Sequence, residues 1–114
     1  METPATWRLW ITTEGDIEMI RPPHPGDTIK EDYLIPLGMS VNRLAKALGV
    51  GTARLNEIVR GRRRVTADTA LRLARYFATS AEFWLNLQSL YDLRTAEAVA
   101  RKKIEREVTP LKVA

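Results

Sequence analysis

The chain has 114 residues, 45% hydrophobic and 28% charged, a composition typical of one globular domain with a modest core. It has no cysteine, no evident carboxylate cluster and one histidine, His24, for which we expect a turn or packing role; we therefore expect no catalytic residues, no metal, no cofactor and no enzyme activity. Without a long apolar run or a basic-then-apolar leader, the sequence indicates a cytoplasmic protein that does not enter a membrane.

The net charge of +4 is distributed unevenly along the chain. Residues 1–42 hold three Lys/Arg and seven Asp/Glu, whereas residues 43–75 hold nine and two. Basic charge gathered in one stretch is the electrostatic pattern expected of a surface that binds phosphates. A solvated basic face without a partner is the alternative interpretation.

Residues 1–21 differ from the rest and are predicted to form an N-terminal arm. Apolar and polar residues alternate around Trp7 and Trp10, and a second strand is predicted at 17–21 after a turn, so the arm is a possible short β-hairpin. Because an isolated hairpin is marginal in water, we expect it to pack on the helical body, a second copy or a partner through these two tryptophans. A mere packing role is the alternative.

Residues 22–108 are predicted to form an all-α, helix-turn-helix DNA-binding domain, followed by a tail at 109–114. A first helix is expected from about residue 26 to residue 35, where Pro36 and Gly38 end it. The acidic residues near its start suit the helix dipole.

Two short apolar patterns with helical spacing follow within residues 40–61. The first stops at Gly49 and the second at Gly61; their apolar members are Val41, Leu44, Ala45 and Leu48, then Leu55, Ile58 and Val59. Ser40 is a good N-cap, and Gly49 stands where the chain must turn in a left-handed conformation. This pattern predicts a helix-turn-helix, with ordinary helical packing as the alternative.

The second helix of this motif is predicted to present a polar and basic surface, as a reader of the DNA major groove requires. Its outward residues are expected to be Thr52, Ala53, Arg54, Asn56, Glu57 and Arg60. The arginines that follow, Arg62, Arg63 and Arg64, are predicted to contact phosphates and so to contribute affinity rather than base reading.

Two more helices complete the predicted five. Thr66 is the expected N-cap of the fourth and Ser80 that of the fifth, which can continue to about Glu107. The fifth carries Trp84 and Tyr91, which either complete the core or contact a partner or a second copy.

The chain resembles the HigA-type antitoxins, a branch of the Xre-like helix-turn-helix family. The similarity covers about residues 22–95, and its most specific parts are Pro22-Pro-His-Pro-Gly-Asp27 and Phe83-Trp-Leu-Asn-Leu-Gln88. The stretches Leu44-Ala-Lys-Ala-Leu-Gly-Val50, Ile58-Val-Arg-Gly-Arg-Arg64 and Thr66-Ala-Asp-Thr-Ala70 follow the same family pattern.

This resemblance implies a phage-repressor-like fold of five helices, a homodimer that binds operator DNA in its own promoter, and neutralisation of a RelE-like messenger-RNA endonuclease toxin. It places base contacts at Thr52, Ala53, Arg54 and Asn56. It also places Asn42 and Arg43 near phosphate, beside the predicted phosphate contacts of Arg60 and the three loop arginines. A stand-alone Xre-like regulator without a toxin partner is the alternative.

Overall fold

The computed structural model describes residues 22–112, and within this range the chain is all-α. A first helical segment is built from α2 (Pro25–Thr28), η1 (Ile29–Leu34) and α3 (Ile35–Leu37). It is followed by α4 (Val41–Leu48), α5 (Thr52–Val59), α6 (Ala67–Phe77) and α7 (Ala81–Glu107). The predicted five-helix fold is confirmed, whereas the predicted hairpin of residues 1–21 lies outside the described residues.

The first helical segment passes through Pro36, so the prediction that it ends near residue 35 is wrong, whereas Gly38 does stop it as a left-handed C-cap with φ 60°, as predicted. Residues Ile29–Leu34 form a π-helix, in which the backbone N–H of Ile35 donates to the carbonyl of Lys30, five residues back. Because a proline ring crowds the carbonyl four residues before it in an α-helix, a widened turn is a place where a proline can be accommodated. The segment then ends at Leu37.

The predicted helix boundaries around the motif are confirmed by their caps. The hydroxyl oxygens of Ser40, Thr66 and Ser80 accept hydrogen bonds from the backbone N–H groups three residues later, at 3.1, 3.4 and 3.0 Å. Gly49 ends α4 with φ 72°, the left-handed conformation that costs glycine least.

One core joins the five segments. Its fully buried side chains include Ile29, Leu44, Leu55, Leu73 and Trp84. The Trp84 indole N–H donates to the Thr79 hydroxyl at 2.8 Å, which satisfies its one polar atom.

The prediction of Trp84 as a candidate for a partner contact is corrected by this packing, whereas the same prediction for Tyr91 stays a prediction. Trp84 is completely buried and offers no surface to a partner. Tyr91 is half-buried, with its ring edge-on to the His24 ring at 4.9 Å between centroids. Trp84 therefore completes the core, the other alternative that the sequence left open, while Tyr91 packs on His24 and keeps part of its side chain exposed.

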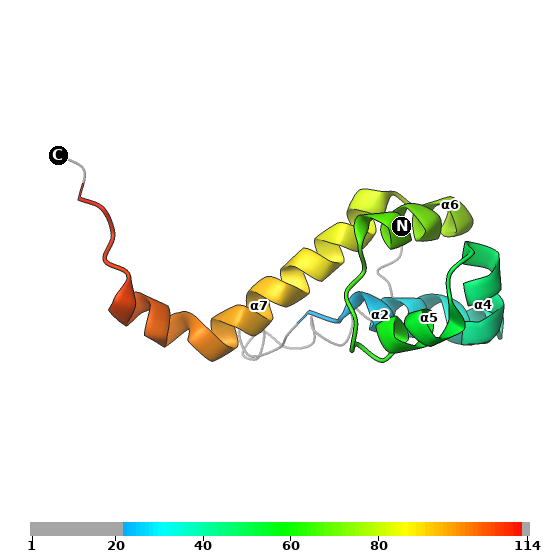
Figure 1. Cartoon of the computed structure of the whole chain (residues 1–114), viewed down its shortest axis with the longest axis horizontal. Coiled ribbons are helices and arrows are strands. Elements are labelled where there is room, and N and C mark those ends of the chain that lie inside the picture. The colour runs from blue at the N-terminus through cyan, green and yellow to red at the C-terminus, as the bar shows by residue number, and fades with distance from the viewer. Residues whose placement is uncertain (1–21, 113–114) are drawn as a thin grey trace.

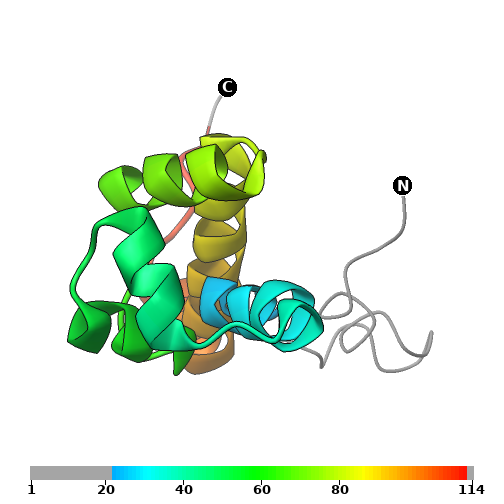
Figure 2. The same cartoon turned by 90° about the vertical axis from the view of Figure 1, so that its right-hand side faces the viewer.

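The molecule is elongated, with extents of 55 × 31 × 24 Å, because α7 projects beyond the other helices (Figure 1). Figure 2 shows the remaining helices gathered around the N-terminal part of α7, with α4 and α5 on one side. In the described part of the chain, no helix has the length and apolar character needed to cross a membrane.

Candidate nucleic-acid interface

Helix α5 is seated on the body of the protein by a close approach to α2. A Cβ atom added to Gly26 would lie 1.9 Å from the carbonyl oxygen of Ile58, so only glycine allows this contact between backbones. The buried face of α5 consists of Leu55, Ile58 and Val59. The opposite face must therefore point to solvent.

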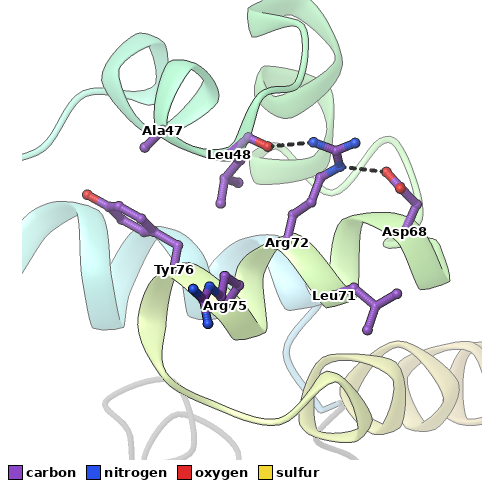
Figure 3. Close-up of a pocket in the computed structure, with 7 residues that line it drawn as sticks. All are labelled: Ala47, Leu48, Asp68, Leu71, Arg72, Arg75 and Tyr76. Carbon is purple, nitrogen blue, oxygen red and sulfur yellow. Dashed lines mark hydrogen bonds and ion pairs between the residues drawn. The ribbon is translucent and has the colours of Figure 1, made fainter.

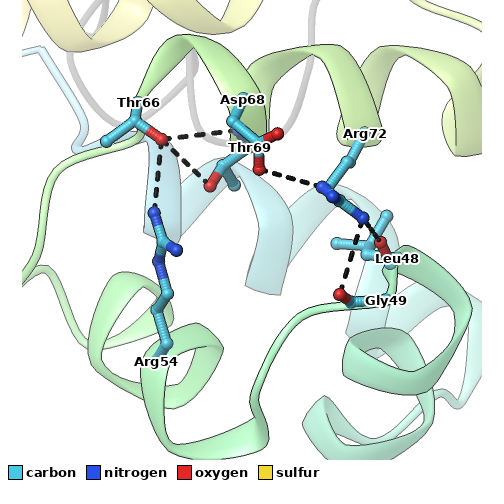
Figure 4. Close-up of polar contacts among 7 residues, drawn as sticks. All are labelled: Leu48, Gly49, Arg54, Thr66, Asp68, Thr69 and Arg72. Atoms are coloured by element: carbon cyan, nitrogen blue, oxygen red, sulfur yellow. Dashed lines mark hydrogen bonds and ion pairs between the residues drawn. The ribbon is translucent and has the colours of Figure 1, made fainter.

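Arg72 of α6 holds the turn between α4 and α5. Its guanidinium donates to the carbonyls of Leu48 and Gly49 at 2.9 and 3.5 Å, and its Nε donates to Asp68 at 2.9 Å (Figure 4). The last carbonyls of a helix lack partners within it, and a cation there also suits the helix dipole. Arg72 thus links α6 to the turn of the motif, a contact that the sequence did not reveal.

The open surface of α5 and its C-cap residue is formed by four exposed residues, which we call the recognition face: Thr52, Ala53, Glu57 and Arg60. Two of them, Thr52 and Ala53, are predicted base-contact residues. The other two residues of that prediction, Arg54 and Asn56, are half-buried on opposite flanks of the helix. The face is therefore narrower than the sequence indicated.

The N-termini of α4 and α5 are joined by side chains. The Thr52 hydroxyl donates to the Asn42 side-chain oxygen at 2.9 Å, and both residues are exposed. Arg43 follows in α4 with an exposed side chain. The structure thus brings these two predicted phosphate-contact residues beside one end of the recognition face.

Arg54 turns away from the recognition face toward α6. Its Nη2 donates to the Thr66 hydroxyl at 3.3 Å, and this oxygen also caps α6 (Figure 4). The Nε of Arg54 is buried and has no hydrogen-bond partner among the residues that the structure describes. Since a contact of Arg54 with a base would require its guanidinium to leave Thr66, that role stays a prediction.

The three loop arginines do not form one cluster. Arg63 pairs with Glu57 of α5 at 3.4 Å, and Arg64 pairs with Asp92 of α7. Within residues 22–112, Arg62 makes no ion pair and is exposed. Of the three, Arg62 is the side chain most available to a phosphate.

A hollow of about 500 Å³ lies beside α5, lined by Asp27, Lys30, Asn56, Val59, Arg60 and Arg62. Three of these residues are cationic. Two of them, Arg60 and Arg62, are predicted phosphate contacts, and the hollow adds Lys30 from the first helical segment. The sequence did not indicate Lys30, because it lies in an acidic stretch and only the packing of η1 beside α5 brings it here.

The loop that carries the arginines is anchored to α7 by Gln88. This side chain is 2% exposed; its Oε1 accepts from the backbone N–H of Val65 at 2.8 Å, and its Nε2 donates to Asp92 at 3.0 Å. Asp92 in turn holds Arg64. The conformation of the loop therefore depends on α7.

His24 stands where the chain enters the domain, and it caps α2. Its Nδ1 accepts from the N–H of Gly26 at 2.9 Å, while Asp27 accepts from the N–H of His24 at 3.2 Å. Burial lowers the pKa of His24 below its ordinary value, and the charge of Arg64 lowers it further. The carboxylates of Asp27 and Asp92 raise the pKa, but they offset only part of the effect of burial. The turn and packing role that the sequence predicted for His24 is confirmed.

A second hollow, of about 550 Å³, lies between α4 and α6 (Figure 3). It is lined by Ala47, Leu48, Asp68, Leu71, Arg72, Arg75 and Tyr76, none of which is a predicted contact residue. Leu71 and Tyr76 are 63% and 42% exposed. This hollow is a surface separate from the residues predicted to touch DNA.

Trp7 and Trp10, the predicted partner-contact residues of the arm, lie outside the described residues. Among residues 22–112, no group of three or more acidic, histidine or cysteine side chains is placed to hold a metal ion.

Two short helices joined through Gly49, with the second seated on the core and open on its other side, define a helix-turn-helix protein. A family model described as helix-turn-helix matches residues 29–84. The virulence-associated protein I of Dichelobacter nodosus is 58% identical over 74 residues, which are 65% of this chain and 68% of that protein.

Two solved structures extend the comparison. An addiction-module antidote protein of the HigA family from Coxiella burnetii is 51% identical, with a TM-score of 0.76 over 81% of this chain and all of that one. The antitoxin HigA of Pseudomonas aeruginosa, solved with the higBA promoter, is 49% identical, with a TM-score of 0.77 and the same coverage. The chain belongs to the HigA family of Xre-like helix-turn-helix proteins.

Proposed function

We propose that this chain is an antitoxin that binds operator DNA as a homodimer and represses its own operon. The observation that carries the proposal is the exposed recognition face of α5, which has Asn42 and Arg43 beside one end and Arg62 beside the other. The relative from Pseudomonas aeruginosa that was solved with promoter DNA supports it.

In this proposal α5 of each protomer enters the major groove, with half-sites about 34 Å apart. Thr52 and Ala53 contact bases directly, and Arg54 and Asn56 reach base edges from the flanks of the helix. Phosphates are contacted by Asn42, Arg43, Arg60, Arg62, Arg63 and Arg64. Base contacts give specificity, and phosphate contacts give affinity that depends on salt.

Binding to duplexes from the chain's own promoter, with random DNA of equal length as the competitor, tests the DNA function. Arg62→Ala should weaken binding to both duplexes alike and lower the salt dependence by about one charge. Arg54→Ala should instead reduce the preference for the promoter, because a bidentate arginine–guanine contact is worth roughly 1–3 kcal/mol. Equal affinity of the unaltered chain for promoter and random DNA would contradict operator binding.

We further propose that the partner is a small RelE-like messenger-RNA endonuclease, which the chain neutralises. The family membership supports this partner, and the seven acidic residues of positions 1–42 suit a basic ribonuclease. We place the contact surface on residues 1–21, which include Trp7 and Trp10.

Growth of cells that express the neighbouring gene, alone and together with this chain, tests the antitoxin function. Arrest with the neighbour alone and growth on co-expression are the expected results. A harmless neighbour would favour a regulator without a toxin. If a chain lacking residues 1–18 still rescues growth, the toxin is bound by another surface of the protein. The hollow between α4 and α6 would then be the next candidate, tested with Leu71→Asp.

A further inference from the structure

Glu57 occupies the centre of the recognition face, although the predicted base contacts do not include it. The core side of α5 is centred on Leu55, and at 3.6 residues per turn Ala53 and Glu57 lie opposite it. Both are exposed, whereas Arg54 and Asn56 at the flanks are half-buried. A helix that enters the groove with this face would bring Glu57 closest to the base edges.

An ion pair holds the carboxylate of Glu57 in place. Its Oε2 lies 3.4 Å from Nε of Arg63, and each side chain is 47% exposed. Within the described chain, Oε1 has no hydrogen-bond partner. A lone carboxylate would be repelled by DNA phosphates, so the arginine both offsets this charge and limits the orientations of the side chain.

The chemistry of a carboxylate restricts which base it can meet. An ionised carboxylate only accepts hydrogen bonds, whereas guanine shows two acceptors in the major groove and thymine an acceptor beside its methyl group. Adenine shows a donor next to an acceptor, and cytosine shows its N4 amino donor alone. A fixed carboxylate therefore favours cytosine, because the major-groove edge of each other base presents at least one acceptor that would repel it.

We propose that Glu57 is a specificity-determining residue that accepts a hydrogen bond from the N4 amino group of one cytosine in each half-site, with Arg63 as its positioning residue. Ala53 lies one turn earlier on the same face, so its methyl group would meet the base pair next to that cytosine. An apolar contact with a thymine methyl group suits this side chain. The inference rests on the proposed entry of α5 into the major groove.

The test measures affinity for a set of promoter duplexes in which each base pair is replaced in turn by the other three. The unaltered chain should lose about 5- to 20-fold on replacement of one C·G pair per half-site, the lower part of the range for a good base contact. Glu57→Ala should lose this preference at that pair alone and bind random DNA more tightly, because a negative charge is gone. Glu57→Gln should shift the preference from cytosine to adenine, whose N6 and N7 match an amide.

Arg63→Ala and Arg62→Ala form a matched pair for the positioning role. Both remove one positive charge from the loop, but of the two side chains only that of Arg63 contacts the Glu57 carboxylate. The contact of Arg62 with Glu57 is a backbone hydrogen bond to the carbonyl oxygen at 2.9 Å, which Arg62→Ala retains. Arg63→Ala should therefore flatten the cytosine preference in addition to weakening binding, and Arg62→Ala should weaken all duplexes alike.

One outcome would overturn the proposed operator binding, and another would overturn only the role of Glu57. If the unaltered chain shows no base preference at any position, the proposed operator binding fails. If it shows preferences and Glu57→Ala retains every one of them, operator binding stands and the assignment of Glu57 is wrong. Glu57 is exposed, and a melting temperature of each variant verifies that it is folded.

Discussion

At the residue scale, the structure explains why the lead-in Pro22-Pro-His-Pro-Gly-Asp27 is so specific. His24 and Asp27 form a reciprocal capping box at the N-terminus of the first helical segment, Pro25 begins it, and Gly26 lets its backbone touch α5. Each residue type is needed for a separate physical reason. The motif therefore determines how α5 packs against the first helical segment.

Gly26→Ala should destabilise the fold strongly. The added Cβ would lie 1.9 Å from the Ile58 carbonyl oxygen, and a backbone cannot move aside as a flexible side chain can. We expect a loss of about 3 kcal/mol, the upper end for overpacking, measured by denaturant unfolding. Gly51→Ser is the control, because nothing lies within 4 Å of its added Cβ and serine is a good N-cap; a similar loss in both variants would contradict this explanation.

His24 should make stability depend on pH. Its folded pKa lies below the ordinary value of 6.5, so the unfolded chain binds the proton more readily. The stabilisation is complete above pH 6.5 and is lost as the pH falls toward the folded pKa, where a protonated Nδ1 can no longer accept from Gly26. Melting temperatures at pH 7.5 and 5.5 should differ less for His24→Asn, which keeps a capping side chain; an unchanged difference would argue against His24 as the source.

At the element scale, the basic loop between α5 and α6 gets its conformation from α7. Gln88 binds the backbone of Val65, and Asp92 binds Arg64. This explains the second specific stretch, Phe83-Trp-Leu-Asn-Leu-Gln88, since Trp84 fills the core and Gln88 fixes the loop. These contacts therefore fix the conformation of the loop against helix α7.

Gln88→Leu should free this loop. It leaves the buried N–H of Val65 without an acceptor, which costs about 1–3 kcal/mol of stability. Hydrogen exchange at the Val65 amide should speed up, and affinity for DNA should fall at all sequences alike. Asn86→Ala, an exposed change on the same helix, should alter stability by no more than about 0.5 kcal/mol; unchanged exchange at Val65 in Gln88→Leu would contradict the anchoring role.

At the scale of the whole molecule, the projecting half of α7 has an apolar side without a neighbour in the described chain. Leu93 and Ile104 are 54% and 51% exposed, and with Ala100 between them they lie on one side of the helix. Exposed apolar side chains in such a row are typical of a helix that pairs with another copy. This half of α7 is thus our candidate for the interface of the proposed homodimer.

Leu93→Asp combined with Ile104→Asp should give a monomer in sedimentation. Affinity for the full promoter site should fall, because two half-sites are then no longer bound by one linked pair. Val99→Asp is the matched control, since Val99 is 79% exposed but lies on another side of α7. A dimer that persists in the double variant and dissociates in the control would place the interface elsewhere.

The sequence by itself determined the features that depend on neighbours within a few residues. Helical spacing, the caps at Ser40, Thr66 and Ser80, and the turn at Gly49 all follow from local steric and hydrogen-bonding preferences, and the structure confirms them. The course of the helix through Pro36 was not predicted, because a π-helical turn has no simple sequence pattern.

Only the tertiary structure decided where the arginines of the candidate interface point. Arg54 reaches a threonine 12 positions away, and Arg64 and Val65 find partners on α7 at separations of 28 and 23 positions. Periodicity tells which side of a helix faces the core, but it carries no information on which distant helix lies beside each flank. The tertiary packing therefore limits the predicted DNA-reading surface of α5 to the recognition face, which has Glu57 at its centre.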